Sequence, residues 1–233
     1  MAVFQFKDFA VDDHGCGMKI STDSVLLGSW ARLPSSGLIA DLGTGSGVLA
    51  LMCCRRSPLA QVEAVEIDPK ASEACRANAD ASPWPHRITT VCASALDFKP
   101  SAPVDLAISN PPYFTTGMLS PDAARAGARH AIGFGPEATV DIAARILAPA
   151  GSLAIITPAD CRATLLAHAE YRRLKLRRIC SVYTVEGKAP TRILWQFSRI
   201  DGDIERQSLC IRLRTGLYSP EYITLTKEFY LNF

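Results

Sequence analysis

Short apolar segments rich in β-branched residues recur along the first 157 residues and alternate with segments of helical character. The apolar segments are 37–42, 61–67, 87–92, 104–109 and 151–157. Helical patterns follow the first two of them, and another, at 136–147, precedes the last. Strands that alternate with helices are typical of a parallel sheet covered by helices on both faces. The sequence therefore predicts an α/β fold.

The pattern changes after a predicted helix at 159–171. Three strand-like segments then follow with only turns between them: RRICSVYTV, TRILWQFSR and SLCIRLR. Strands joined by short turns run antiparallel, so we expect the sheet to end in antiparallel strands. A length of 233 residues suits a single domain. We expect an N-terminal segment (1–36), a core (37–160), and C-terminal strands with a helix (161–233).

The composition excludes several classes of protein. No apolar run approaches the ~20 residues of a membrane span, and acidic residues interrupt the N-terminus before a signal peptide could form. The eight cysteines include no C-x-x-C pair, and the four histidines show no metal-ligand spacing. We therefore expect reduced cysteines, a cytoplasmic location and no bound metal.

A glycine loop, ADLGTGSG at 40–47, follows the first predicted strand and opens a helix. Gly43, Gly45 and Gly47 allow a sharp turn and let a ligand touch the backbone. Their spacing is G-x-G-x-G. Because NAD, FAD and other nucleotide cofactors use similar loops, the glycines alone do not identify the ligand, and a purely structural turn also remains open.

Two acidic residues narrow the choice of ligand. Asp41 precedes the loop, where a carboxylate would repel a pyrophosphate but can accept a hydrogen bond from a cationic amino group. Glu66 ends the second predicted strand, where an acid pairs with ribose hydroxyls. Together they favour a cofactor with a ribose, an amino acid group and no phosphate, which describes S-adenosylmethionine. A dinucleotide site is the alternative.

A second motif, SNPPYF at 109–114, follows the fourth predicted strand. Pro111 and Pro112 cannot continue a strand ladder and stiffen the turn. Asn110 offers an amide acceptor and two donors, and Tyr113 offers a flat face. A rigid turn of this kind suits a planar group that carries an NH₂. The alternative is a proline-rich turn that merely ends a strand.

In this order, the glycine loop, the two acids and the NPPY motif resemble class I S-adenosylmethionine-dependent methyltransferases that methylate amino groups. This part of the resemblance covers about residues 37–160. It implies a Rossmann-like fold with a seven-stranded, mostly parallel sheet, antiparallel C-terminal strands and helices on both faces. In that family the loop and the acid hold the cofactor, and the NPPY turn holds a planar NH₂ group.

Other segments narrow the resemblance within this family. Segments 4–30, 85–88, 187–198 and 218–231 resemble the bacterial methyltransferases that modify N6 of the adenosine 3′ of the anticodon in a valine tRNA. The similarity then spans nearly the whole chain. It implies methyl transfer from S-adenosylmethionine to an adenosine of a tRNA anticodon loop. Separately, we expect a monomer. In the family the segment 18–30 closes over the methionine end of the cofactor.

The resemblance also implies a set of site residues. Those expected to bind the cofactor are Lys19, Thr22, Asp41, Gly43, Thr44, Gly45, Gly47, Glu66, Ile67, Ser94, Ala95 and Asn110. Many class I enzymes place an Asp after the third strand to bond the cofactor adenine. This chain has Ser94 near that place and Asp97 three residues on, so the residue that meets the adenine stays open.

The expected catalytic residues are Asn110, Pro111, Pro112 and Tyr113. An exocyclic amine is a poor nucleophile because its lone pair is conjugated with the ring. The Asn110 side-chain carbonyl and the Pro111 main-chain carbonyl can each accept one amine hydrogen, which turns the lone pair toward the methyl group. The prolines fix these directions in advance, and Tyr113 can stack on the base. No general base is evident.

The C-terminal half is basic, since residues 151–215 carry 12 Lys and Arg against 6 Asp and Glu. This balance permits a polyanionic partner. The segment 114–135 has no clear period and is predicted to be a mobile loop beside the site. The residues expected to bind substrate are Tyr113, Arg125, Arg129, His130, Lys188 and Arg192. The alternative is that the charged ones are ordinary surface residues.

Several related activities share NPPY. They are methylation of a glutamine amide in release factors, of adenine in DNA and of guanine N2 in ribosomal RNA. The 42 residues before Gly43 are too few for the N-terminal helical domain of the glutamine enzymes. The segment after the core is short and strand-like for a DNA target-recognition region. A non-catalytic cofactor- or RNA-binding module is a further alternative, against which the complete motif counts.

Overall fold

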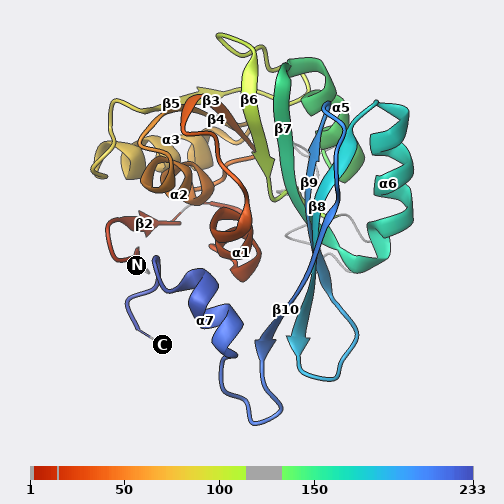
Figure 1. Ribbon diagram of the computed structural model, residues 1–233. Coiled ribbons are helices and arrows are strands. Elements are labelled where there is room, and N and C mark those ends of the chain that lie inside the picture. The colour runs from red at the N-terminus through yellow and green to blue at the C-terminus, as the bar shows by residue number, and fades with distance from the viewer. Residues whose placement is uncertain (1–2, 15, 114–132, 233) are drawn as a thin grey trace.

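The computed structural model describes residues 3–14, 16–113 and 133–232 (Figure 1). Its elements in chain order are β1 (Val3–Gln5), β2 (Ala10–Asp12), α1 (Thr22–Trp30), β3 (Ser36–Leu42), α2 (Val48–Arg56), β4 (Leu59–Glu66), α3 (Pro69–Asp80), β5 (Ile88–Cys92), β6 (Val104–Ser109), α5 (Pro136–Ile146), β7 (Leu147–Pro158), the 3₁₀ turn η1 (Ala159–Cys161), α6 (Arg162–Tyr171), β8 (Lys175–Val185), β9 (Arg192–Ser198), β10 (Glu205–Arg212) and α7 (Pro220–Thr226).

The main sheet has the strand order β10-β8-β9-β7-β6-β3-β4-β5. Among the residues that the structure covers it has eight strands, one more than the seven expected. The mixed, mostly parallel sheet predicted from the sequence is confirmed. Only β9 runs against its neighbours β7 and β8, whereas β10 pairs with β8 in parallel. The reason is that the segment 199–204 crosses the start of β8 instead of turning back beside β9.

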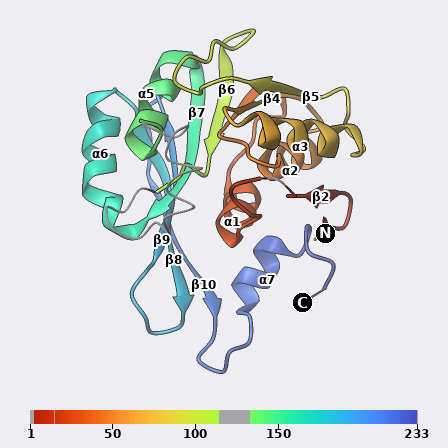
Figure 2. The ribbon, with the colours of Figure 1, turned by 180° about the vertical axis from the view of Figure 1, so that it is seen from behind.

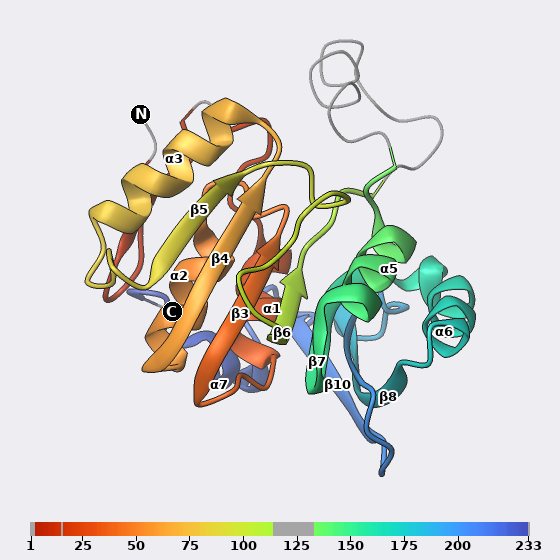
Figure 3. The ribbon, with the colours of Figure 1, turned by 90° about the horizontal axis from the view of Figure 1, so that it is seen from above.

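Helices cover both faces of the sheet, as Figure 2 shows from behind and Figure 3 from above. One hydrophobic cluster unites α1, α2, α3 and α7 with one face, and the other unites α5 and α6 with the opposite face. Strand β3 shows the two-residue alternation that this requires. Its Leu38, Ala40 and Leu42 belong to the α5 side, and Ile39 belongs to the α1 side.

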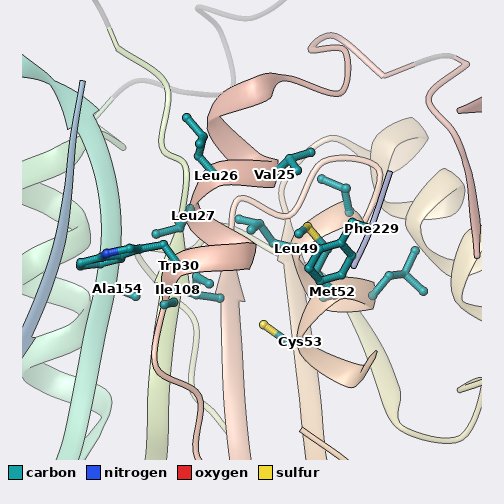
Figure 4. Packing of buried hydrophobic residues seen from close by; sticks show 14 of the residues in the cluster. Val25, Leu26, Leu27, Trp30, Leu49, Met52, Cys53, Ile108, Ala154 and Phe229 are labelled. Atoms are coloured by element: carbon teal, nitrogen blue, oxygen red, sulfur yellow. The ribbon is translucent and has the colours of Figure 1, made fainter. Parts of the chain in front are cut away.

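Helix α1 is buried on almost every side, and Figure 4 shows it packed between the sheet and α2. Its close approach to α2 depends on Gly28, where an added Cβ would lie 2.6 Å from the Met52 sulfur. The N-terminal and C-terminal segments meet beyond these helices, because Phe6 pairs with Tyr230 in an isolated bridge. No helix in the covered ranges has the length and hydropathy needed to cross a membrane.

The strand order fixes where a ligand can bind. The chain moves outward from β3 to β4 and β5, then returns to β6 on the other side of β3. Ligands of such sheets bind beyond the carboxyl ends of the strands where this reversal occurs. The glycine loop follows β3, Glu66 ends β4 and Asn110 follows β6, so all three predicted features lie at that edge.

Candidate active site

The glycine loop between β3 and α2 folds over the end of β4. The backbone N–H groups of Gly43 and Thr44 both donate to the carbonyl oxygen of Val65 at 2.9 Å. Gly45 has a φ of 57°, and a Cβ there would meet no heavy atom within 4 Å. The loop therefore leaves open space beside its own backbone, as a loop that cradles a ligand requires.

The side chain of Phe134 covers the first glycine of this loop. A Cβ added at Gly43 would lie 2.8 Å from Cε1 of Phe134. One added at Gly133 would lie 3.6 Å from Leu96, which follows β5. Residues 133–134 thus bring the glycine loop together with the segment after β5. Sequence reasoning missed Phe134, since nothing local marks it as a partner of a loop so distant in the chain.

Asp41 is fully buried, and a side-chain hydrogen bond reaches only one of its two carboxylate oxygens. Its Oδ2 accepts a hydrogen bond from the Thr44 hydroxyl, whereas its Oδ1 is buried without a hydrogen-bond partner. Burial raises the pKa of Asp41 to about 7. The hydrogen bond from Thr44 and the backbone N–H of Ala50 oppose this rise, and the nearby charge of Glu66 adds to it. A buried carboxylate oxygen without a partner is costly. It fits a ligand that brings a cationic amino group, such as the methionine end of S-adenosylmethionine.

The Glu66 carboxylate, in contrast, accepts hydrogen bonds from the backbone at both of its oxygens. Its Oε2 accepts from the N–H of Gly45 and its Oε1 from the N–H of Asp68, both at 2.9 Å. Asp68 in turn caps α3 by accepting from the N–H of Lys70 at 3.0 Å. Glu66 therefore fixes the glycine loop relative to the start of α3, and Ile67 lies between these two anchors.

Asn110 lies between α1 and its own motif. Its Nδ2 donates to Ser24 Oγ at 3.0 Å and to Ser21 Oγ at 3.3 Å. Its Oδ1 accepts from the hydroxyl of Tyr113 at 2.7 Å. The amide is thus held at both ends beside the carboxyl edge of β6. The contacts to α1 were not foreseen, because the two serines signal only a helix start in the sequence.

Tyr113 is held by its hydroxyl and covered by a cation. Its hydroxyl also lies 2.8 Å from the carbonyl oxygen of Ile156 on β7, and its single hydrogen can serve only one of the two acceptors at a time. The Arg192 guanidinium lies over the ring, 5.6 Å from its centroid. Burial raises the pKa of the phenol, so Tyr113 stays protonated and can donate.

Of the five charged residues predicted to bind substrate, the structure describes two, Arg192 and Lys188. Arg192, at the start of β9, is paired with Asp23 of α1 at 2.7 Å. Lys188 is exposed on the turn between β8 and β9, at the same edge of the sheet. The structure brings Arg192 against Tyr113 but leaves Lys188 further along this edge. The other three predicted residues, Arg125, Arg129 and His130, lie outside the residues that the structure describes, as does most of the loop 114–135.

The remaining predicted cofactor residues lie near the same edge. Thr22 is the first residue of α1. Lys19 is 67% exposed and donates to Asp13 at 3.0 Å. Ser94 follows β5 and is half-buried, with its hydroxyl accepting from the N–H of Leu96 at 3.2 Å; Ala95 beside it is buried. Asp97 is exposed, so Ser94 lies nearer the interior than Asp97. Within the covered ranges no three His, Cys, Asp or Glu side chains gather into a metal site.

Comparison with known proteins agrees with this geometry. The sequence model of the methyltransferase small domain family matches residues 16–175. A tRNA1(Val) (adenine(37)-N6)-methyltransferase from Tolumonas auensis is 43% identical over 230 residues, which cover 98% of this chain and 96% of the relative. A protein of the same name from Porphyromonas gingivalis is 41% identical over 241 residues, covering 98% of this chain and 94% of the relative.

Solved structures show the same fold at lower identity. A predicted O-methyltransferase from Agrobacterium tumefaciens matches with a TM-score of 0.68 at 20% identity, covering 89% of this chain and 96% of that one. Geranyl diphosphate C-methyltransferase from Streptomyces coelicolor matches with a TM-score of 0.54 at 14% identity, covering 75% of each chain. The resemblance inferred from the motifs is confirmed. The chain belongs to the methyltransferase small domain family, alongside the bacterial tRNA1(Val) (adenine(37)-N6)-methyltransferases.

Proposed function

We propose that this chain uses S-adenosylmethionine to methylate the exocyclic N6 amine of an adenosine in a tRNA anticodon loop, with valine tRNA as the expected species. One observation carries the proposal. The Asn110 amide is fixed between α1 and Tyr113 at the same strand edge as the half-satisfied carboxylate of Asp41. The names of the relatives supply the RNA class and the base. A tRNA substrate also implies a cytoplasmic enzyme.

Asp41 and the glycine loop would hold the cofactor. When bound, S-adenosylmethionine supplies its methyl group as an electrophilic carbon on a sulfonium. Asp41 Oδ1 would accept from the amino group of the methionine end, and the loop backbone would line the ligand at Gly43, Gly45 and Gly47. The residues proposed to complete this site are Lys19, Thr22, Thr44, Glu66, Ile67, Ser94, Ala95 and Asn110.

The NPPY turn would hold the target amine. Asn110 Oδ1 has a second lone pair besides the one that faces Tyr113, and the Pro111 carbonyl lies next along the turn. Each can accept one amine hydrogen, which leaves the nitrogen lone pair free to form the new bond. Once that bond forms, the nitrogen is acidic and its proton can pass to water. Tyr113, which burial keeps neutral, would stack on the base with Pro112 stiffening its approach.

The tRNA would lie along the carboxyl edge of the sheet. Lys188 is exposed there and suits a phosphate contact. Arg125, Arg129 and His130 remain proposed contacts from the sequence alone. Arg192 already shares its charge with Asp23, so we expect it to act mainly by supporting Tyr113.

The test is methylation of bulk tRNA from a strain that lacks the gene, with labelled cofactor and nucleoside mass spectrometry. We expect N6-methyladenosine from an anticodon stem-loop, and a rate reduced at least a hundredfold by Asn110→Ala. Cofactor affinity should fall far less than the rate in that variant, because Asp41 and the glycine loop are proposed to hold most of the cofactor. Labelled N2-methylguanosine in ribosomal RNA, or methylglutamine in a release factor without any tRNA product, would overturn the proposed substrate.

A further inference from the structure

The first turn of α1 contacts the catalytic motif directly. Ser21 is the N-cap of α1, and its Oγ accepts from the N–H of Ser24 at 3.3 Å. Both serine hydroxyls then meet the same atom, Nδ2 of Asn110. The turn is anchored next to this contact, because Asp23 pairs with Arg192 of β9 at 2.7 Å. The serines are therefore held in place relative to Asn110.

These contacts bear on which way the Asn110 amide faces. The oxygen and nitrogen ends of an amide have nearly the same shape, but one accepts hydrogen bonds and the other donates them. Ser21 Oγ receives the N–H of Ser24 as a helix cap and lies 3.3 Å from Ser24 Oγ. With Ser21 donating to Ser24, each hydroxyl keeps one lone pair for the Asn110 nitrogen. Tyr113 approaches the opposite end of the amide with a hydroxyl. When the Tyr113 hydroxyl gives its hydrogen to Asn110 rather than to the Ile156 carbonyl, the amide oxygen faces Tyr113 and the nitrogen faces the two serines, which is the arrangement in the structure.

The orientation matters because the target group is itself an NH₂. A carbonyl oxygen can accept its hydrogens, whereas a reversed amide would present an NH₂ to an NH₂ and hold nothing. We infer that Ser24, supported by Ser21, is a positioning residue for methyl transfer that keeps the Asn110 carbonyl directed to the substrate amine. This inference rests on the proposed role of Asn110.

Helix α1 offers a matched control. Ser29 lies on the same helix and is buried to the same extent as Ser24, both being 8% exposed. The Ser29 hydroxyl is buried without a hydrogen-bond partner. Ser24→Ala and Ser29→Ala therefore remove the same atom from similar surroundings, and only the first removes a contact to Asn110.

The experiment measures methyl transfer as S-adenosylhomocysteine formed per enzyme, with saturating tRNA and cofactor. We expect Ser24→Ala to lower kcat by about five- to tenfold with little change in either KM, the effect of losing roughly one hydrogen bond in the transition state. Ser29→Ala should match the wild type. Ser24→Cys fills the space, with a slightly larger atom, but bonds weakly. It should resemble Ser24→Ala and covers the case in which the alanine variant folds poorly.

A double-variant comparison separates positioning from a structural role. In an Asn110→Ala background, Ser24→Ala should have almost no further effect on kcat, because the residue acts only through Asn110. Equal kcat values for Ser24→Ala and Ser29→Ala, or a full further loss in the Asn110→Ala background, would overturn the inference. If Asn110→Ala itself kept wild-type turnover, the proposed role of Asn110 would be wrong. That result differs from one in which Asn110→Ala is inactive and only the Ser24 variants behave like the wild type.

Discussion

Asp41 and Glu66 end neighbouring parallel strands, yet the chain satisfies only one of these two carboxylates. Both oxygens of Glu66 accept backbone N–H groups at 2.9 Å. Asp41 is entirely buried, and its Oδ1 has no hydrogen-bond partner. Glu66 therefore ties the glycine loop to the start of α3. We propose that the Asp41 oxygen accepts from a cationic group of the ligand.

The affinity for S-adenosylmethionine should therefore depend on pH through Asp41. Burial raises its pKa to about 7, and the carboxylate must lose its proton before it can accept from an ammonium. Affinity should rise nearly tenfold between about pH 5 and pH 6 and more slowly toward pH 7, below the titration of the ligand amino group near 7.7–8.0. Calorimetry in buffers of different ionisation enthalpy should show proton release. Asp41→Asn should bind weakly, with a nearly flat profile over this range.

The same group should affect folding stability with the opposite sign. The folded pKa of Asp41 lies above its ordinary value of 3.8, so between these two values the folded protein holds a proton that the unfolded chain has lost. The free energy of unfolding should fall as the pH rises from about 4 to about 7. Asp41→Asn removes this penalty and should be more stable than the wild type at pH 8, by at most about 4 kcal/mol.

Urea denaturation without cofactor, at pH 5 and at pH 8, checks this second expectation. The gap between Asp41→Asn and the wild type should widen at the higher pH. If the two proteins kept the same gap at both pH values, Asp41 would not titrate in this window. Such a result would also remove the basis for the pH-dependent affinity.

Two substitutions at Tyr113 should separate its hydroxyl from its ring. Tyr113→Phe keeps the ring under Arg192 but removes the hydroxyl that lies between Asn110 and the Ile156 carbonyl. We expect a lower kcat with little change in the KM for tRNA. Tyr113→Ala also removes the stacking surface, worth ~1–3 kcal/mol per base, and should raise the KM as well. Steady-state kinetics with one anticodon stem-loop measures both, and equal KM values for the two variants would exclude a stacking role.

The features that the sequence predicted correctly are those with local signals. The glycine loop and the NPPY turn directly follow apolar segments, and Glu66 lies at the end of one. Parallel strands bring such positions to one edge. The parallel pairing of β10 could not be read locally, because it depends on which edge of β8 the segment 199–204 reaches. The short turns alone predict antiparallel pairing, and for β10 this prediction is wrong.

The contacts that complete the site connect segments far apart in the chain. Ser24 and Asn110 are separated by 86 positions, and Asp23 and Arg192 by 169. A serine near a helix start indicates a cap whatever lies opposite it, and a lone arginine indicates a surface cation. Only the packing of α1 against the sheet shows that Ser24 contacts the motif and that Asp23 pairs with the arginine above Tyr113. Arg192, expected to contact phosphate, has a carboxylate partner of its own.

The last prediction concerns tRNA binding, for which β8 provides an internal control. Lys188 lies just beyond the carboxyl end of β8, at the proposed active edge, and Lys175 is the first residue of the same strand, at the opposite edge. Lys175 is 50% exposed, and its ammonium is 4.0 Å from Asp201. If the RNA lies along the active edge, Lys188→Ala should weaken tRNA binding and reduce the slope of log affinity against log salt by about one. Lys175→Ala should leave both unchanged, and neither variant should alter cofactor affinity. Filter-binding titrations over a range of salt concentrations measure the slopes. Equal slopes for Lys188→Ala and the wild type, or a loss confined to Lys175→Ala, would place the RNA elsewhere on the protein.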